Sequence, residues 1–302
     1  MTLVAAACAV CGGAAFDAVF PSTISDPETD PAAYFSSSRR RAGYLNIVRC
    51  RECRLMLTSP RDDDATLGRV YAELADVEYA EEEDNRQLTA EDHCSLVTAC
   101  LPGRGLLLDV GCATGVFAGV AHQRGWTVTG LDASAWATAR ARAQHPGVTF
   151  VTGSVEATRF HPATFAAITL WDVMEHVPSP LNTLRQLHQS LLPGGCLFLN
   201  LPNAESLVAR CMGRHWILLL REHLWYFSPP TLTRLLATAG FEVISIRTNR
   251  VRFSVANVLG RSAQYRHPLA GMAKRFARSR WLRHQAVRFP IGEMTVVARR
   301  RA

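Results

Sequence analysis

The sequence predicts an α/β fold with a doubly wound, mostly parallel sheet and a small cysteine-bearing module at the N-terminus. From about residue 106 onward, short apolar runs alternate with helix-forming stretches, which is the pattern of a parallel sheet with crossover helices. Two Cys-x-x-Cys pairs stand before this region. The 302 residues, 48% of them hydrophobic, can bury one large core and an appended module.

The first apolar run and the loop after it predict a ligand-binding site. A strand over residues 106–110 is followed by a glycine-containing loop, a helix over 116–124 and a second strand over 126–131 that ends in Asp132. In a parallel sheet, such a loop lets backbone N–H groups approach a ligand, and an acid about 20 residues later can hold ribose hydroxyls. The sequence therefore predicts a cofactor that contains a nucleoside.

The loop reads Asp109-x-Gly111-x-Ala113-x-Gly115, whereas a dinucleotide fingerprint reads Gly-x-Gly-x-x-Gly. It resembles motif I of the class I S-adenosylmethionine (SAM) methyltransferases, with Ala113 in place of the middle glycine. The loop alone leaves an ordinary strand-to-helix turn open as an alternative. The later motifs favour the SAM interpretation.

Further strands are predicted at 148–151, 165–170, 196–201 and 294–298. Between the second and third of these, a helix begins at Pro180 after a Ser179 cap and is stopped by Gly194-Gly195.

Several phrases carry a wider resemblance: DVMEHVPSP from residue 172, LLPGG from 191, LPN from 201 and HLWYFSPPTLTRLLATAGF from 223. Over roughly residues 88–300 the chain resembles SAM-dependent methyltransferases related to ubiquinone-biosynthesis and sugar methyltransferases. The resemblance implies a seven-stranded Rossmann-like sheet and SAM as the methyl donor. Its motifs place the cofactor-binding residues at Asp109, Gly111, Cys112, Ala113, Gly115, Asp132, Ala133, Ser154, Val155, Glu156 and Trp171, with Ser154 where the family often has Asp.

The N-terminal cysteines are Cys8, Cys11, Cys50 and Cys53. Two such pairs can supply four thiolates to one tetrahedral zinc ion, and a zinc-ribbon-like module over residues 1–60 is also what the resemblance suggests. A redox dithiol and an incidental pattern are the alternatives. Catalytic zinc is disfavoured because four sulfur ligands leave no open position.

The composition indicates in which cellular compartment the protein is expected. Nine cysteines without an extracellular context indicate reduced thiols, and neither a signal peptide nor a membrane span is recognised. The chain has one lysine, Lys274, among its 33 basic residues, which is typical of a GC-rich bacterial genome. We expect a bacterial cytoplasmic protein.

Charge is unevenly distributed. Residues 61–87 form an acidic segment, expected to be a helical linker that either covers the cofactor cleft or, as favoured, presents a solvated face. The methyltransferase domain is expected over 88–302, with a basic insertion at about 254–288. This insertion suits contact with anionic lipid, nucleic acid or a phosphorylated substrate. The favoured alternative is a packed helix with a solvated basic face.

Methyl transfer to a hydroxyl group needs alignment of the reacting atoms and a base that removes the proton. His223 is the predicted base and His176, with Glu175, is expected to order the loop beneath the cofactor; Tyr226 is the third catalytic candidate. Asp172 is an alternative that would hydrogen-bond the acceptor.

The sequence therefore predicts a SAM-dependent methyltransferase that acts on a small-molecule acceptor: a hydroxyl of a sugar, glycan or secondary metabolite. The alternatives are a sugar C-methyltransferase, a zinc-ribbon rRNA methyltransferase and a non-enzymatic SAM-binding scaffold. Nucleic acid is disfavoured because residues 171–174 read Trp-Asp-Val-Met rather than the Asn/Asp-Pro-Pro-aromatic turn of base amino-group methyltransferases. The oligomeric state is left open.

Overall fold

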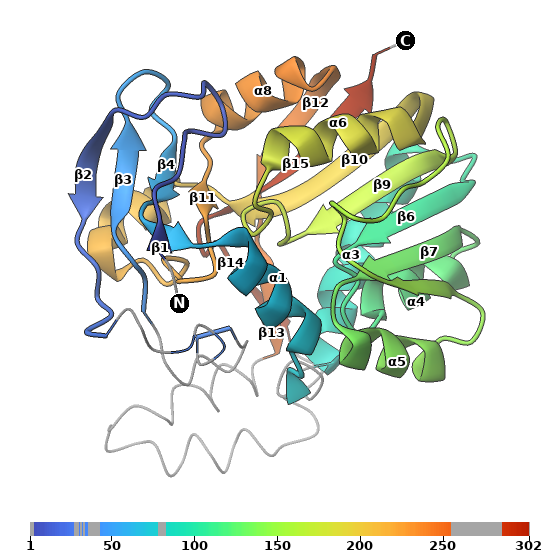
Figure 1. The fold of residues 1–302 in the computed structure, drawn as a ribbon. Coiled ribbons are helices and arrows are strands. Elements are labelled where there is room, and N and C mark those ends of the chain that lie inside the picture. Colours follow the sequence, from blue (N-terminus) through green and yellow to red (C-terminus); the bar gives the residue numbers. More distant parts are fainter. Residues whose placement is uncertain are drawn as a thin grey trace.

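The computed structural model describes residues 3–26, 30, 32, 34–35, 43–77, 83–254 and 286–301. Its centre is a seven-stranded sheet (Figure 1). In spatial order the strands are Phe241–Thr248 (β12), Glu293–Arg300 (β15), Leu191–Pro202 (β10), Phe165–Trp171 (β9), Leu106–Val110 (β6), Thr127–Asp132 (β7) and Thr149–Thr152 (β8). β15 runs antiparallel to both of its neighbours, and the pairs from β10 to β8 are parallel. The expected mostly parallel Rossmann-like sheet is confirmed.

Helices cover both faces of this sheet. They are Glu83–Cys100 (α3), Val116–Gln123 (α4), Ala135–Gln144 (α5), Pro180–Ser190 (α6) and Pro229–Thr238 (α8). Figure 1 shows α6 and α8 above one face, with α4 and α5 on the other. Successive strand residues point to opposite faces, so Leu108 packs in the core that α6 and α8 cover and Leu107 packs in the core with α3 and α4. This two-sided burial explains why the strands read as continuous apolar runs.

The N-terminal module contains the strands Leu3–Val4 (β1), Phe16–Phe20 (β2), Ile47–Cys50 (β3), Met56–Thr58 (β4) and Arg61–Asp62 (β5). We call the described part of residues 3–62 the cysteine module. β1 pairs with β5, while β2, β3 and β4 form an antiparallel sheet with Trp225–Tyr226 (β11) as its fourth strand. The strand β5, which pairs with β1, ends at Asp62, and the fourth strand of the antiparallel sheet comes from the segment after β10.

The acidic segment is helical over Asp64–Glu73 (α1), and α3 begins at Glu83, so that helix crosses the boundary expected at residue 88. Leu67 and Val70 of α1 are buried in the main core, so this helix presents one face to the protein and not only to solvent.

The remaining elements are Leu207–Met212 (α7), the 3-10 turn Gly213–His215 (η2) and the paired strands Val251–Ser254 (β13) and Ala286–Phe289 (β14). Residues 255–285, which hold most of the basic insertion and its proposed membrane contact, lie outside the described residues. Among the described helices, none has both the length and the apolar character that crossing a bilayer requires.

Candidate functional site

The loop after β6 has the backbone conformation that its glycines permit. Gly111 has a φ of 72°, and its N–H donates to the carbonyl of Leu131 at 2.7 Å. A Cβ on Gly111 would lie 2.4 Å from Cγ2 of Val173, so only glycine fits. Ala113 also has a positive φ, 46°. The loop is thus held against β7 and the turn after β9.

Two carboxylates at the strand ends have different surroundings. Asp109 is buried, accepts a hydrogen bond from Thr169 Oγ1 at 2.7 Å, and burial raises the pKa of its carboxyl to about 7. Asp132 accepts one bond on each oxygen, from the N–H groups of Ala113 and Ser134, both at 2.8 Å. Each carboxylate oxygen has a further lone pair, so Asp132 can join the two turns and still accept a bond from a ligand.

A cavity of about 1010 Å³ opens at this edge of the sheet. That volume is at the upper end of the range for small-molecule sites, about 300–1,000 Å³. Of the predicted cofactor residues, those lining it are Asp109, Gly111, Cys112, Ala113, Asp132, Ala133, Ser154, Val155, Glu156 and Trp171. Gly115 is not among the described lining residues; it begins α4 with a φ of 83°, and a Cβ there would meet Phe150 at 2.8 Å.

His176 and His223 line the same cavity, with their rings 4.7 Å apart. Nδ1 of His223 lies 2.8 Å from the carbonyl of Leu218. A carbonyl only accepts, so this nitrogen carries the proton and Nε2 is the basic nitrogen. Nδ1 of His176 lies 2.8 Å from the Tyr71 hydroxyl and 3.0 Å from the Glu222 carbonyl, and burial lowers its pKa to about 4.

Glu175 lies beside the two histidines and is almost fully buried. One ligand atom from each of Glu175, His176 and His223 falls within 4.8 Å of the others, a grouping of residue types that can also hold a divalent cation.

Tyr226 is not brought to the cavity; it is not among the described residues that line it. Its side chain is buried in β11, and its hydroxyl donates to the carbonyl of Leu220 at 3.1 Å and accepts from the N–H of the same residue at 3.2 Å. Burial also raises its pKa. These contacts support a role in shaping the loop.

The structure joins Asp172, an acceptor-binding candidate from the sequence, to three residues that sequence reasoning missed: Asn200, Asn249 and Glu293. Together they form the floor of the cavity. The Asn200 amide donates to Asp172 Oδ1 at 2.6 Å and to Glu293 Oε2 at 3.1 Å, and the Asn249 amide donates to the same Glu293 oxygen at 2.8 Å. All four residues line the cavity. Asp172 has a positive φ of 56°, and its side chain is open to the cavity. Desolvation by the surrounding protein and repulsion from the Glu293 carboxylate raise the pKa of its carboxyl. One signal was present in the sequence: Asn200 is a polar residue inside an apolar strand.

His93 on α3 was also missed by sequence reasoning. Its ring stacks on the indole of Trp171 with centroids 3.9 Å apart and an interplanar angle of 15°. Burial lowers the pKa of His93 to about 4, which keeps the imidazole neutral at pH 7. This pair forms the wall of the cavity next to α3.

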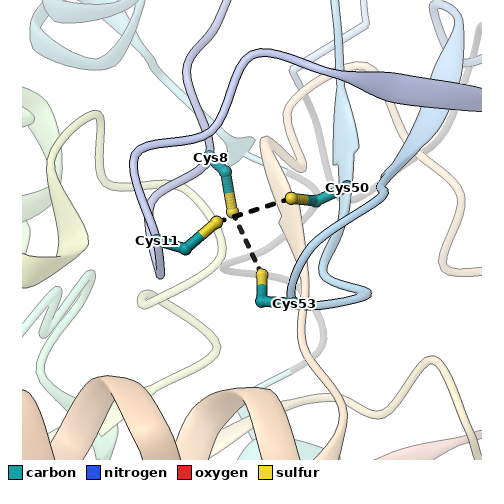
Figure 2. Close-up of side chains that lie close together, drawn as sticks. All are labelled: Cys8, Cys11, Cys50 and Cys53. Atoms are coloured by element: carbon teal, nitrogen blue, oxygen red, sulfur yellow. Dashed lines mark hydrogen bonds between the residues drawn. The ribbon is translucent and has the colours of Figure 1, made fainter.

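The four N-terminal cysteines converge on one point (Figure 2). Their Sγ atoms all lie within 4.8 Å of one another, with 3.3 Å between Cys8 and Cys53 and 3.5 Å between Cys11 and Cys50. A tetrahedral site with Zn–S bonds of about 2.3 Å places sulfurs roughly 3.8 Å apart. All four cysteines are free of disulfides, so the donor set and its spacing fit a zinc ion.

The two cysteine pairs also share a backbone design. Gly12 follows the first pair with a φ of 77°, and Arg54 follows the second with a φ of 69°. Each donates its N–H to the carbonyl of the first cysteine of its pair, at 2.8 Å for Cys8 and 3.1 Å for Cys50. The matching turns aim both pairs of thiols at the same centre.

Comparison with known proteins identifies a family model, two relatives and a solved structure that the chain matches. Residues 79–246, more than half of the chain, match the family model described as "Methyltransferase domain". The chain is similar to the "Ubiquinone biosynthesis O-methyltransferase" of Azoarcus sp. (strain BH72), with 31% identity over 52% of this chain and 70% of that protein. It is also similar to the protein of the same name from Pseudomonas paraeruginosa, with 32% identity over 38% of this chain and 52% of that protein.

Among solved structures, an S-adenosylmethionine dependent methyltransferase from Mesorhizobium loti aligns with 19% identity and a TM-score of 0.46. The alignment covers 68% of this chain and 96% of that one.

Proposed function

Because the chain belongs to the methyltransferase domain family, we propose that it is a SAM-dependent O-methyltransferase acting on a hydroxyl of a small-molecule sugar, glycan or secondary metabolite. The observation that carries the proposal is a single cavity in which the glycine loop and Asp132 lie together with the imidazoles of His176 and His223. We call the loop 111–115 with the turns at Asp132 and Ser154 the donor side. We call the residues 172–176, 216–226 and the floor at Asn200 and Glu293 the acceptor side.

The donor side fits SAM. Gly111 lines the cavity without a side chain of its own, so its backbone is accessible to a ligand, and Asp132 retains acceptor capacity for ribose hydroxyls. When bound, SAM supplies a methyl group on a positively charged sulfur. Residues 154–156, which line the cavity beyond Asp132, would flank the adenine.

On the acceptor side, His223 would remove the proton of the acceptor hydroxyl through Nε2. The bond from its Nδ1 to Leu218 fixes both the tautomer and the ring orientation. His176 is held by Tyr71 and the Glu222 carbonyl and would order the wall beside it. The amide and carboxylate groups of Asp172, Asn200 and Glu293 offer hydrogen bonds to other hydroxyls of the acceptor.

A second acceptor class has support from the relatives, which are named for ubiquinone biosynthesis. A phenolic hydroxyl of a quinone precursor would also need a base. The aromatic ring that carries this hydroxyl is flat and could lie beside the indole of Trp171 at the cavity wall.

We also infer that Cys8, Cys11, Cys50 and Cys53 hold a structural zinc ion. The convergence of four sulfurs from two matching turns supports this inference. With four protein ligands the ion would have no open position, so its contribution would be to folding and not to the chemistry.

The test is methyl transfer from SAM labelled on its methyl group to three kinds of acceptor: nucleotide sugars and oligosaccharides, catechols, and ribosomal RNA. We expect label on a hydroxyl of the first or second kind. Label on carbon, or on ribosomal RNA alone, would replace the proposal by one of its alternatives. Methyl transfer is also measured with added divalent metal and with a chelator, because Glu175 and the two histidines could bind a cation.

His223→Ala should lower kcat by about 10²- to 10⁴-fold because the base is lost, with the affinity for SAM unchanged. His215→Ala is the matched control, since His215 is exposed and lies in the same segment. Normal turnover by His223→Ala would remove His223 from the mechanism and leave Asp172 as the candidate that contacts the hydroxyl.

A further inference from the structure

The cysteine module is joined to the acceptor side by a shared sheet. β11 pairs with β4, matching Trp225 to Leu57 and Tyr226 to Met56. β4 pairs in turn with β3, which ends at Cys50. One strand, β4, therefore separates the strand that ends at Cys50 from β11, which begins two residues after His223.

Thr58, the last residue of β4, donates hydrogen bonds to two successive carbonyls, those of His223 and Leu224. Its hydroxyl donates to the His223 carbonyl at 2.7 Å, and its N–H donates to the Leu224 carbonyl at 3.0 Å. The Thr58 side chain is buried, so water does not replace this contact. The backbone that carries the proposed base is thus fixed from the cysteine module.

A buried ion pair fixes the same loop two residues earlier. Asp62 accepts from Nε of Arg221 at 2.9 Å and from Nη2 at 2.8 Å, and both side chains are almost fully buried. The two parallel bonds set the orientation of the guanidinium as well as its distance. The guanidinium also lies 5.2 Å from the ring of Tyr34, another residue of the module.

The donor side is organised differently. Its turns are held by bonds within the central sheet region, from Ala113 and Ser134 to Asp132 and from Gly111 to Leu131. The C-terminal end of α1 contacts the donor side, where Ser134 Oγ donates to the carbonyl of Leu74 at 2.6 Å. This contact lies outside the four-stranded sheet.

We propose that the cysteine module is a positioning element for the acceptor side, in which Thr58, Asp62 and Arg221 act as positioning residues for His223. The proposal rests on the proposed role of His223 as base. Loosening the module would then displace the base and slow methyl transfer while the affinity for the methyl donor stays constant. A displacement of about 1 Å is enough to cost roughly 10²-fold in rate.

The test compares Thr58→Val with Thr58→Ser in the full chain. Valine keeps the volume and removes the hydroxyl, whereas serine restores the bond to the His223 carbonyl. Three measurements are made: amide hydrogen exchange over residues 216–227, the Kd for S-adenosylhomocysteine by calorimetry, and kcat with the acceptor that the wild type methylates. Asp62→Asn serves as an independent second variant, because it removes the charge opposite Arg221 at nearly constant shape.

For Thr58→Val we expect exchange over 216–227 to accelerate at least tenfold, kcat to fall about 10- to 100-fold, and the Kd to change less than twofold. Thr58→Ser should behave as the wild type. Unchanged exchange over 216–227 in both Thr58→Val and Asp62→Asn would overturn the proposal. So would an equal acceleration over residues 109–134 with weakened donor binding, since that indicates general destabilisation. If the wild type methylates no acceptor, the proposed function fails, while exchange and donor affinity still decide whether the module positions the loop.

Discussion

On the donor side of the cavity, the bonds that shape the site join neighbours in the chain: Ala113 reaches Asp132 across 19 positions. On the acceptor side, Thr58 reaches His223 across 165 positions and Arg221 reaches Asp62 across 159. The donor side is one local supersecondary unit, which can be recognised as a motif. The acceptor side is assembled from distant segments, so its geometry depends on how two parts of the fold meet.

Removing the cysteine cluster should have the largest effect on the acceptor side. Replacing Cys50 and Cys53 together by serine removes two of the four thiolate ligands and should abolish zinc binding. Structural zinc contributes about 10–16 kcal/mol to the folding of small zinc-dependent peptides, so its loss should destabilise the cysteine module. We expect one zinc per chain in the wild type and none in the double variant, with methyl transfer lost and donor binding retained. Metal analysis and calorimetry check both points.

Cys211→Ser is the control for that experiment, since Cys211 is exposed and distant in sequence from the cluster. Zinc retained by the double variant would exclude the cluster as its site. Loss of donor binding together with zinc would show that the two sides are not separable.

A single methyl group added at Gly111 should weaken the binding of SAM to the donor side. Gly111→Ala places a Cβ against Val173 at a position with positive φ, which adds overpacking of about 1–3 kcal/mol to a backbone cost of about 1–2 kcal/mol. We expect SAM affinity to fall at least about tenfold, since the loop must move. Hydrogen exchange should accelerate more over the loop 111–115 than over 216–227, because the new Cβ contacts the loop directly and reaches 216–227 only through Val173 and Glu175.

Gly103→Ala is the matched control because nothing lies within 4 Å of a Cβ at that position. Equal loss of affinity in both variants would mean that the effect is not specific to the loop. Titration calorimetry and urea unfolding measure the two quantities.

The smallest effect is in the pH dependence of stability, where the two sides have opposite signs. The Asp109 pKa is raised by burial to about 7, so the folded state holds a proton that the unfolded state has lost between pH 4 and 7, and stability falls as pH rises. The His176 pKa is lowered by burial to about 4, so the unfolded state binds the extra proton between pH 4 and 6.5, and stability rises with pH.

Each group contributes a slope of up to about 1.4 kcal/mol per pH unit in its window. Urea unfolding between pH 4.5 and 6.5 should therefore show a more positive slope for Asp109→Asn than for the wild type. His176→Asn should show a less positive one. The same direction of change in both variants would contradict the opposite assignments.

Much of the fold was predictable because its signals are local. Apolar runs such as 106–110 and 165–170 are buried on both faces and appear as strands close to the expected bounds. Pro180 begins α6 as expected, although Ser179 makes no capping bond through its side chain. The predicted loop between Asp109 and Gly115 connects β6 to α4, and Gly111, Ala113 and Gly115 in it have positive φ angles.

The sequence predicted which residues of the acceptor side are catalytic candidates, but not which of their side chains face the cavity. His176 and His223 line the cavity, but Tyr226, three residues after His223, faces the loop backbone. Side-chain direction in that segment is set by the pairing of β11 with β4. The partner strand lies far away in the sequence, so no local pattern specifies which of these residues faces the cavity.

By itself the sequence determined the sheet, the glycine loop with Asp132 and the two cysteine pairs, because each depends on periodicity or spacing within a short segment. The folded structure was needed to show that Trp225–Tyr226, just after His223, joins the sheet of the cysteine module, and that Asn200 joins Asp172 to Glu293 beneath the cavity. Those contacts join residues 28 to 165 positions apart. Such pairings form when buried polar groups must find partners in the folded core, and that requirement is met in space and not along the chain.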